Sequence, residues 1–423
     1  MRVLVVGSGA REHALAHRLA SERDVGEILC APGNPGIKAI ARLVHADLSR
    51  LDGLVDIVER EQVDFTVVGP ELPLSLGLAD RLASQGHLVF GPTAAAARLE
   101  SSKAFAKAFM ARHGVPTARF EVVESVAAAT STLRSGKFGF PIVLKADGLA
   151  AGKGVVIAGN LDQAEAAAHE AMDDRRFGDA GLRLVIEECL SGPEVSFFVI
   201  ADGTRAVFIG AAQDHKRIFD DDRGPNTGGM GAFAPSLLVD DALHDRVMKD
   251  IVNPVVAGMA LEGHEFRGFL YAGLMLTDAG PKVIEFNVRL GDPEAQVVLS
   301  RVDEPLLPLL VAGAAGQLRH ASCRLSSERL VGIVLASRGY PESSQSGCEI
   351  EGVTEAEQVP GVSVFHAGTA LREGRLVTAG GRVLTVVGGG RDFSEAIGRA
   401  YEGVRKISFD GMQYRRDIGR KAL

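Results

Sequence analysis

Strict alternation of apolar and polar residues marks Lys282–Glu294 as a β-strand with chemistry on one face, because successive strand side chains point to opposite sides. The polar face is expected to hold Val283, Glu285, Asn287 and Arg289. The apolar face is expected to hold Ile284, Phe286, Val288 and Leu290. Mg²⁺ prefers oxygen ligands and is usually held by one or two protein groups, a role that suits Glu285 and Asn287. Arg289 would add positive charge for phosphate or carboxylate oxygens. The alternative is an ordinary half-buried strand with a solvated face.

Apolar strands alternate with helical patterns over the first 100 residues, which predicts an open parallel α/β sheet. The expected strands are Arg2–Val6, Glu27–Cys30, Asp64–Val68 and His87–Phe90. Each strand is followed by a turn rich in Gly or Pro: GSGAREHA, APGNPG, GPE and GPT. Ligands of such sheets bind beyond the carboxyl ends of the strands, so these turns form the expected binding edge.

Further along, the pattern predicts a helix from a Ser cap near 101 to His113-Gly114, then a compact α+β unit ending near Cys189. A mixed segment follows to about 320, and new strands and a terminal helix come after a polar stretch at 322–329. A length of 423 residues fits about three compact units at roughly 150 residues each. The expected domains are an N-terminal α/β domain at 1–100, a central domain at 101–321 and a small C-terminal α/β domain at 322–423.

Composition narrows the function classes. A chain with 46% apolar and 24% charged residues is typical of a soluble globular protein. The formal charge of −8, without any run of Lys and Arg, argues against a nucleic-acid partner. No apolar run reaches the ~20 residues that span a bilayer, and Leu306–Ala315 is expected to be a buried helix, so no membrane partner is expected. Four scattered cysteines without metal-ligand spacing favour a reducing compartment, and we expect the cytoplasm.

The turn after the first strand is similar to a dinucleotide-binding motif but departs from it. Glu12 stands where the third glycine belongs, and the second strand ends without an acidic residue for a ribose hydroxyl. A helix N-terminus near Ala10 still offers N–H groups and positive potential to a phosphate, with Arg11 beside it. A phosphorylated small substrate is therefore favoured over a nicotinamide cofactor.

The run DGLAAGKGVVIA, residues 147–158, is no Walker loop. Only three residues separate Gly148 from Gly152, and Gly154 stands where Ser or Thr should bind Mg²⁺. A glycine hairpin over phosphates remains, with backbone N–H groups and Lys153 as donors, beside the alternative of a plain hairpin turn.

Two neighbouring features extend this nucleotide interpretation. Lys145 ends the apolar strand Ile142–Ala146 next to the glycine turn, so it is a candidate phosphate partner. Glu187 and Glu188 lie at a strand end, where carboxylates and free backbone groups can bind an adenine edge and ribose hydroxyls. Simple solvation of both carboxylates is the alternative.

The order of these features resembles the ATP-grasp superfamily. The chain has first a helix lysine (Lys103), then a strand lysine with a glycine turn, then an E-E-x-L-x-G-x-E hinge and finally an E-x-N strand. Within it the chain resembles the glycinamide ribonucleotide synthetase family, through GSGAREHA, APGNPG, VGPE, FGPT, KADGLAAGKGV, QDHKR, GPNTGGMGA, GFLYAGLM, KVIEFN and RLGDPE. The resemblance runs from residue 1 to the RRDIG stretch at 415–419. In place of the family's usual R-F-G-D-P-E, this chain has Leu290, an apolar-face position where we expect no loss of activity.

The resemblance implies ATP-dependent ligation of glycine to 5-phosphoribosylamine through a glycyl phosphate, giving glycinamide ribonucleotide, ADP and phosphate. Mg²⁺ or Mn²⁺ would be the cofactor, and an ATP-grasp core would carry a mobile lid subdomain at about 118–188. The resemblance also allows a transient contact with the upstream enzyme that makes phosphoribosylamine. There are two alternatives. One is a different carboxylate–amine ligase acting on another ribonucleotide, and the other is a nucleotide-binding regulator without turnover.

The resemblance also implies a role for each site residue. The implied ATP site comprises Lys103, Lys145, Gly148, Gly152, Lys153, Gly154, Glu187, Glu188, Leu190 and Glu194. The implied phosphoribosylamine site comprises Gly9, Arg11, Glu12, Asn34 and Glu71. Glu285 and Asn287 would hold the metal, and Arg289 and Asp292 would lie near the acyl phosphate or the incoming amine. Asp214 would bind the glycine ammonium, or belong to an exposed loop.

Two histidines have alternative roles. His13 and His215 are either general bases or structural histidines with satisfied hydrogen bonds.

Overall fold

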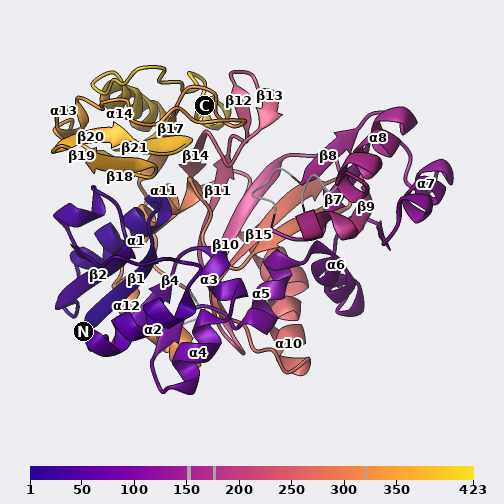
Figure 1. Cartoon of the computed structure of the whole chain (residues 1–423), viewed down its shortest axis with the longest axis horizontal. Coiled ribbons are helices and arrows are strands. Elements are labelled where there is room, and N and C mark those ends of the chain that lie inside the picture. The colour runs from indigo at the N-terminus through magenta and orange to yellow at the C-terminus, as the bar shows by residue number, and fades with distance from the viewer. Residues whose placement is uncertain (150–153, 175–177, 320–321) are drawn as a thin grey trace.

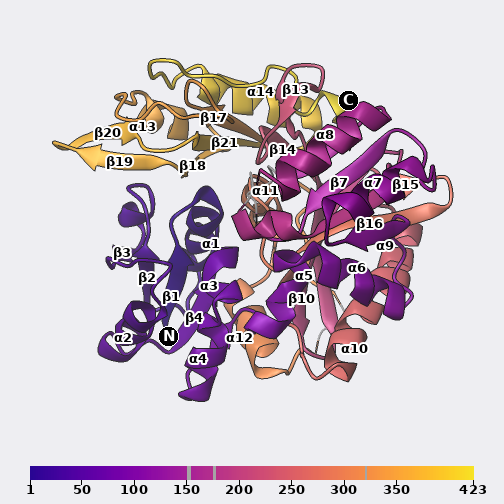
Figure 2. The ribbon, with the colours of Figure 1, turned by 45° about the vertical axis from the view of Figure 1, so that its right-hand side comes forward.

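The computed structural model describes residues 1–149, 154–174, 178–319 and 322–423. It consists of an N-terminal unit, a unit that projects to one side, and a large sheet that runs into the C-terminal part (Figure 1). Turning the molecule brings the projecting unit forward and shows the N-terminal unit and the C-terminal part on the other side (Figure 2).

The N-terminal unit is a parallel sheet in the order β3-β2-β1-β4-β5, as the strand pattern predicts. Its strands are β1 Arg2–Gly7, β2 Glu27–Pro32, β3 Arg42–Leu43, β4 Phe65–Val68 and β5 Val89–Phe90. Its helices are α1 Ala10–Ala20, α2 Leu51–Arg60, α3 Glu71–Ser75 and α4 Leu78–Ser84. The side chains of Val3 to Val6 are fully buried because helices cover both faces of the sheet, and the two-residue β3 is an addition to the predicted strands.

Two consecutive helices connect this unit to the rest of the chain: α5 Ala94–Ser101 and α6 Lys103–Arg112. Thr93 caps α5 by accepting a hydrogen bond from the Ala96 N–H at 3.3 Å. Ser102 caps α6 by accepting from the Phe105 N–H at 3.1 Å, so the predicted Ser-capped helix is confirmed.

The projecting unit is an antiparallel sheet in the order β6-β9-β7-β8 with two helices. Its elements are β6 Phe120–Val123, α7 Val126–Arg134, β7 Ile142–Ala146, β8 Val155–Ala158, α8 Leu161–Met172 and β9 Leu184–Glu188. It has its own apolar core, in which Leu133, Leu144 and Ile186 pack together and which shares no member with the other cores. The unit therefore packs around a core of its own.

The large sheet has eight strands in the order β16-β15-β10-β11-β14-β17-β21-β18. They are β10 Glu194–Asp202, β11 Ala206–Asp214, β14 Gly231–Ala234, β15 Arg267–Thr277, β16 Gly280–Asn287, β17 Arg329–Ala336, β18 Val362–His366 and β21 Arg382–Gly390. Because β14 pairs with β17, the sheet continues across the predicted boundary between 321 and 322. The three domain ranges therefore stay predictions.

The remaining strands and α-helices lie around this sheet. They are the hairpins β12 Arg217–Phe219 with β13 Arg223–Asn226 and β19 Thr369–Arg372 with β20 Arg375–Thr378, and the helices α9 Asp241–Val247, α10 Asn253–Leu261, α11 Glu294–Val298, α12 Leu306–Ala315, α13 Val353–Glu357 and α14 Phe393–Val404. Leu306 and Leu310 of α12 are fully buried, so the predicted buried helix is confirmed. In the described part of the chain, no helix is both long enough and apolar enough to cross a bilayer.

One apolar core joins the N-terminal sheet to the large sheet. It contains Val5 and Leu15 from the N-terminal unit, Phe198 from β10 and Leu310 from α12. This packing holds the carboxyl ends of β1 and β4 next to the residues that follow β16.

Candidate active site

The turn after β1 is built around Glu12. Its Oε2 accepts a hydrogen bond from the Gly9 N–H at 2.6 Å, which satisfies the backbone donor of the N-cap residue of α1. A Cβ added at Gly69 would lie 2.2 Å from Glu12 Oε1, and one at Gly7 would lie 2.5 Å from its Cγ. Burial raises the pKa of Glu12, and Arg11 opposes that rise. The glycines here therefore make room for a buried carboxyl group, which explains why this turn does not suit a dinucleotide.

Arg11 points from α1 toward the turn after β4. Its Nη1 donates to the Gly69 carbonyl at 3.0 Å and lies 3.9 Å from Glu71 Oε2. Its Nε forms no hydrogen bond within the described residues but lies 3.5 Å from Glu12 Oε1 in an ion pair. The guanidinium thus lies between the carboxylates of Glu12 and Glu71.

Asn34 is 5% exposed, and its side chain is occupied by backbone groups. Its Nδ2 donates to the Ser8 carbonyl at 2.9 Å and to the His366 carbonyl at 2.8 Å, while Oδ1 accepts from the Ile37 N–H at 3.0 Å. Both amide hydrogens are therefore used in joining the N-terminal turns to β18. A role for Asn34 in binding substrate stays a prediction, and only the second lone pair of Oδ1 remains for it.

Arg289 lies between two carboxylates. Its Nε donates to Glu71 Oε2 at 3.3 Å, and its Nη2 lies 2.8 Å from Glu100 Oε1. Burial lowers the pKa of Arg289, but the neighbouring carboxylates outweigh burial and raise it. Glu100 also accepts from the Val288 N–H at 2.8 Å. The guanidinium is thus fixed at the edge where α3, α5 and β16 meet.

The predicted alternation along β16 holds for Glu285 and Asn287 but is wrong for Val283. The β15–β16 ladder pairs Gly273 with Glu285 and Leu274 with Val283, so Ile284 forms a bulge. Val283 consequently belongs to the same buried apolar cluster as Phe286 and Val288. Leu290 is 1% exposed within an apolar cluster, as expected for its face.

Glu285 faces a group of cations. Burial alone would raise its pKa, but Lys216 and Lys145 outweigh burial and lower it. One amide atom of Asn287 lies 3.0 Å from Glu100 Oε1, and because a carboxylate oxygen accepts, that atom is assigned as the nitrogen and the other as the oxygen. An ionised carboxylate and an amide oxygen are hard donors, and this pair fits Mg²⁺. The described residues contain no cluster of three or more His, Cys, Asp or Glu able to hold a metal.

The two lysines predicted for ATP approach this strand from different elements. Lys145 Nζ donates to the carbonyl of the bulged Ile284 at 3.0 Å. Lys103 Nζ, at the start of α6, donates to the Gly148 carbonyl at 2.9 Å. Burial lowers the pKa of Lys103, whereas Glu285 raises it. Lys145 therefore contacts β16 directly, and Lys103 lies close enough to Glu285 of that strand to interact with its charge.

The glycine turn is described in part. Asp147 Oδ1 accepts from the Ser102 hydroxyl at 2.9 Å and from the Ala104 N–H at 3.1 Å, which ties the turn to the start of α6. The Gly154 carbonyl accepts from the Ala146 N–H at 2.8 Å. The predicted ATP residues Gly152 and Lys153 lie outside the described residues.

The hinge after β9 has carboxylates on opposite sides of the strand. Glu187 is 3% exposed and pairs with Lys145 and Lys107. Partial burial would raise the pKa of Glu188, but hydrogen bonds from Arg119 and Lys282 lower it to about 2. The hinge continues through the half-buried Leu190.

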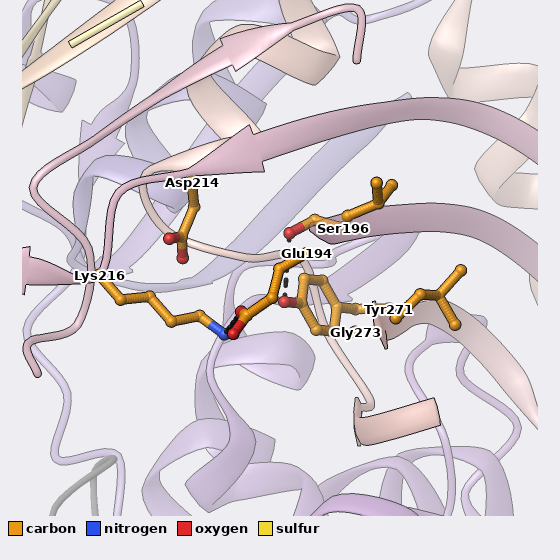
Figure 3. A pocket seen from close by; sticks show the side chains of 8 residues that line it. Glu194, Ser196, Asp214, Lys216, Tyr271 and Gly273 are labelled. Carbon is orange, nitrogen blue, oxygen red and sulfur yellow. Dashed lines mark hydrogen bonds and ion pairs between the residues drawn. The ribbon is translucent and has the colours of Figure 1, made fainter. Parts of the chain in front are cut away.

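A small pocket opens between β10, β11 and β15 (Figure 3). Lys216 Nζ forms an ion pair with Glu194 Oε2 at 2.7 Å, and Ser196 Oγ donates to Glu294 Oε1 at 3.0 Å. Burial raises the pKa of Asp214 to about 8, with Glu294 adding to the rise and Lys216 opposing it. Asp214 is thus part of a pocket and not of an exposed loop.

Asp292 turns toward the N-terminal unit. Its Oδ1 accepts from Gln296 Nε2 at 3.0 Å, and a Cβ at Gly9 would lie 3.7 Å from its Oδ2. Burial would raise the pKa of Asp292, but Arg382 and Arg11 lower it. The RLGDPE turn and the first turn of the chain therefore lie side by side in the candidate site.

The two histidines differ. His13 Nδ1 accepts from the His366 N–H at 2.9 Å, and burial lowers its pKa to about 3, so it has the features of a structural histidine. His215 is 1% exposed, with neither ring nitrogen hydrogen-bonded in the described part of the chain. Burial lowers its pKa to about 4.

Sequence reasoning missed several buried or half-buried charged residues that shape the site. They are Glu100, Lys107, Asp147, Lys216, Glu294 and Arg382. Lys107 and Glu100 lie on helical faces that otherwise carry apolar residues, and that signal could have identified them. The contacts of Arg382 depend on a long-range fold and leave no local signal.

Known proteins resemble this chain over its whole length. Models of the phosphoribosylglycinamide synthetase N domain, ATP-grasp (A) domain and C domain match residues 1–100, 101–295 and 330–421. A phosphoribosylamine–glycine ligase of Xylella fastidiosa is 51% identical over 428 residues, covering 100% of this chain and 98% of its own. A ligase of the same name from Neisseria meningitidis is 48% identical over 425 residues, covering 100% of both.

Solved structures agree with these relatives. The crystal structure of a phosphoribosylamine–glycine ligase from Thermotoga maritima has a TM-score of 0.86 and 35% identity, covering 99% of this chain and 100% of its own. The biotin carboxylase domain of Hydrogenobacter thermophilus 2-oxoglutarate carboxylase, in complex with MgADP, has a TM-score of 0.74. At 19% identity, covering 98% and 91% of the two chains, it shares the fold alone. Because the three domain models match in order and the relatives align end to end, the chain belongs to the phosphoribosylglycinamide synthetase family.

Proposed function

We propose that this chain ligates glycine to 5-phosphoribosylamine with ATP, giving glycinamide ribonucleotide, ADP and phosphate, a step of purine biosynthesis. Family membership supports the activity. The structural observation that carries it is the single carboxylate of Glu285, whose pKa is lowered by four cations. These cations are Lys216, Lys145, Lys103 and Arg289. Cationic side chains grouped around one carboxylate suit a site where a substrate carboxylate must approach a triphosphate.

The chemistry proceeds in two steps. A carboxylate oxygen of glycine forms a bond to the γ-phosphorus of ATP while the bond from that phosphorus to ADP breaks, giving glycyl phosphate. The amine of phosphoribosylamine then attacks the acyl carbon, phosphate leaves, and the amine nitrogen gives up a proton. Positioning and charge neutralisation supply the catalysis, so no protein nucleophile is needed.

Mg²⁺, or Mn²⁺ in its place, would be held by Glu285 and Asn287. When bound, the ion neutralises phosphate charge. Glu285 is suited to this because its pKa is lowered, and Asn287 because its amide nitrogen is already engaged by Glu100. Arg289 and Asp292 would face the acyl phosphate or the incoming amine.

The three substrates occupy three neighbouring places in this proposal. ATP lies between the hinge at 187–190 and the lysines Lys103 and Lys145, with Glu194 at the ribose. Glycine places its ammonium at Asp214. The phosphoribosylamine phosphate lies at the turns around Gly9 and Arg11, where the Arg11 guanidinium offers positive charge.

The projecting unit, within the range of about 118–188 that the sequence predicts for a lid, would close over ATP. Closure would exclude water that otherwise hydrolyses the glycyl phosphate. Its separate apolar core supports movement as a body. A location in the cytoplasm remains our prediction, and the four cysteines, all free thiols, agree with it.

An ADP-release assay tests this function, with ATP, Mg²⁺, glycine and freshly made phosphoribosylamine, each omitted in turn. We expect sustained ADP release only when all are present. A ligase for another ribonucleotide would not require phosphoribosylamine, and a regulator would bind ATP without turnover. ADP release indifferent to glycine would contradict the proposal.

A further inference from the structure

Lys107 is a buried lysine that the proposed chemistry does not use. It lies on α6 four residues after Lys103, hence on the same side of the helix one turn further along. Only 2% of the residue is exposed. A lysine is almost never buried to this extent without a partner, so its contacts indicate what it does.

The Lys107 ammonium shares one carboxylate with Lys145. Glu187 Oε2 forms an ion pair with Lys107, and Glu187 Oε1 forms one with Lys145. The three side chains are 3%, 4% and 7% exposed for Lys107, Glu187 and Lys145. The cluster therefore contains two positive charges and one negative charge in a largely dry place.

A second set of contacts fixes Lys107 in this position. Its Nζ donates to Thr117 Oγ1 at 2.7 Å, and Thr117 Oγ1 donates to the Val283 carbonyl at 2.7 Å. Val283 belongs to β16, two residues before Glu285. Lys107 thus connects α6 to the metal strand, while Lys145 contacts the same strand at Ile284.

Charge interactions are strong where water is excluded, so the number of cations around Glu187 matters. With Lys145 as its sole partner, Glu187 would form a neutral ion pair. That pair would keep the Lys145 ammonium at Glu187 and would offer no net charge to a phosphate. A second cation on the far side of the carboxylate weakens that hold. It also leaves the cluster with a net positive charge.

We propose that Lys107 is a positioning residue for ATP. Its ion pair with Glu187 offsets the negative charge of that carboxylate and so leaves Lys145 available to the triphosphate. This inference rests on the proposed function, because it takes Lys145 as the phosphate partner. Lys107 itself does not touch the nucleotide.

The charge state of Lys107 supports the same role. Burial lowers the pKa of Lys107 to about 8; Glu187 raises it, Lys145 lowers it further and Glu188 raises it. Besides these charged groups, the ring of Phe120 lies 5.9 Å from Nζ. As pH rises through about 8, Lys107 loses its charge, and the affinity for ATP should fall with it.

Three substitutions test the proposal through the Kd of a non-hydrolysable ATP analogue with Mg²⁺, measured by calorimetry. Lys107→Met removes the charge and should weaken binding by at least about tenfold, whereas Lys107→Arg should stay within about threefold of the wild-type chain. Lys137→Met is the matched control. This lysine lies on the projecting unit between α7 and β7, is 53% exposed and pairs with Glu121, so its loss should leave the Kd unchanged.

A double variant separates this role from a structural one. If Lys107 acts by offsetting Glu187, then Glu187→Gln added to Lys107→Met should recover part of the lost affinity. Neutralising an unpaired buried carboxylate also favours folding, so thermal unfolding of both variants is measured beside the Kd, and the recovery must appear in the affinity of folded protein. Wild-type affinity in Lys107→Met, or no recovery in the double variant, would overturn the inference.

The pH profile of Lys107→Arg provides a test if Lys107→Met does not fold. Arginine keeps its charge, so this variant should lose less affinity than the wild-type chain between about pH 7 and pH 9. Equal losses in both proteins would overturn the inference. Wild-type protein that binds the analogue but releases no ADP with both substrates would contradict the proposed function instead.

Discussion

Single carboxylates in this site differ in ionisation because each one faces a different set of charges. The pKa of Glu285 is lowered by lysines that outweigh its burial, whereas burial, with nearby carboxylates adding to it, raises that of Asp214 to about 8. The sequence predicted both residues as site members from their motifs. It could not predict their charge states, because these depend on Lys216 and Glu294, which approach from other elements.

Glu285→Gln tests the proposed metal ligand at the scale of one residue. The change keeps the shape of the side chain but removes its negative charge, so turnover should fall about 100-fold or more. Part of the loss should be recovered at high Mg²⁺. Activity would be measured as ADP release over a Mg²⁺ titration, with thermal unfolding to verify folding. Near-normal turnover at limiting Mg²⁺ would show that Glu285 does not hold the ion.

Asp214→Asn is expected to raise KM for glycine about tenfold, because a bound ammonium favours the ionised carboxylate that asparagine cannot form, and to change KM for ATP little. The difference in unfolding free energy between this variant and the wild-type chain should also change with pH. Folding raises the pKa of Asp214 from 3.8 to about 8, so the folded state binds the proton more tightly. The stability from this group is therefore full below about pH 4 and is lost as pH rises toward 8.

The variant cannot ionise at this position, so its stability relative to the wild-type chain should increase between about pH 5 and pH 8. Urea unfolding at both pH values measures this. A stability difference that stays constant across the range would mean that the Asp214 carboxyl is not protonated in the fold.

At the scale of elements, the sequence predicted the strands and helices better than their exact pairing. The alternation placed Glu285 and Asn287 together, but the bulge at Ile284 follows from the register with β15 and has no local signal. Likewise Asn34 was expected at a substrate, yet its amide bonds to His366, which is 332 residues away. Contacts of that separation depend on how whole elements pack.

The turns of the N-terminal sheet provide a matched pair of glycine substitutions. In Gly69→Ala the new Cβ would meet Glu12 Oε1 at 2.2 Å, so we expect a loss of about 1–3 kcal/mol in unfolding free energy and a higher KM for phosphoribosylamine. Gly53→Ala lies in α2 with nothing within 4 Å, and should gain about 0.5–1 kcal/mol. Urea unfolding and initial rates would measure both. Equal stability of the two variants would rule out a steric role for the turn.

At the scale of the whole molecule, the projecting unit stands apart because its core is separate from those of the two sheets. The sequence predicted this unit, since strand and helix patterns are compact there. It did not predict that one sheet continues through β14 and β17 across the expected domain boundary.

Hydrogen exchange with and without a non-hydrolysable ATP analogue tests closure of this unit. We expect slower exchange at the start of α6 and around Gly148 and Gly154, because closure would bury the glycine turn. The interior of α2 serves as the control and should not change. Unchanged exchange around the glycine turn, with the analogue shown to be bound, would contradict closure.

The path of one oxygen atom tests the central claim most directly. If glycine is activated as glycyl phosphate, one carboxylate oxygen must leave with the phosphate when the amine attacks. With glycine labelled with ¹⁸O in its carboxylate, mass spectrometry of the released phosphate should show one labelled oxygen per turnover. Unlabelled phosphate, formed together with glycinamide ribonucleotide, would contradict the account.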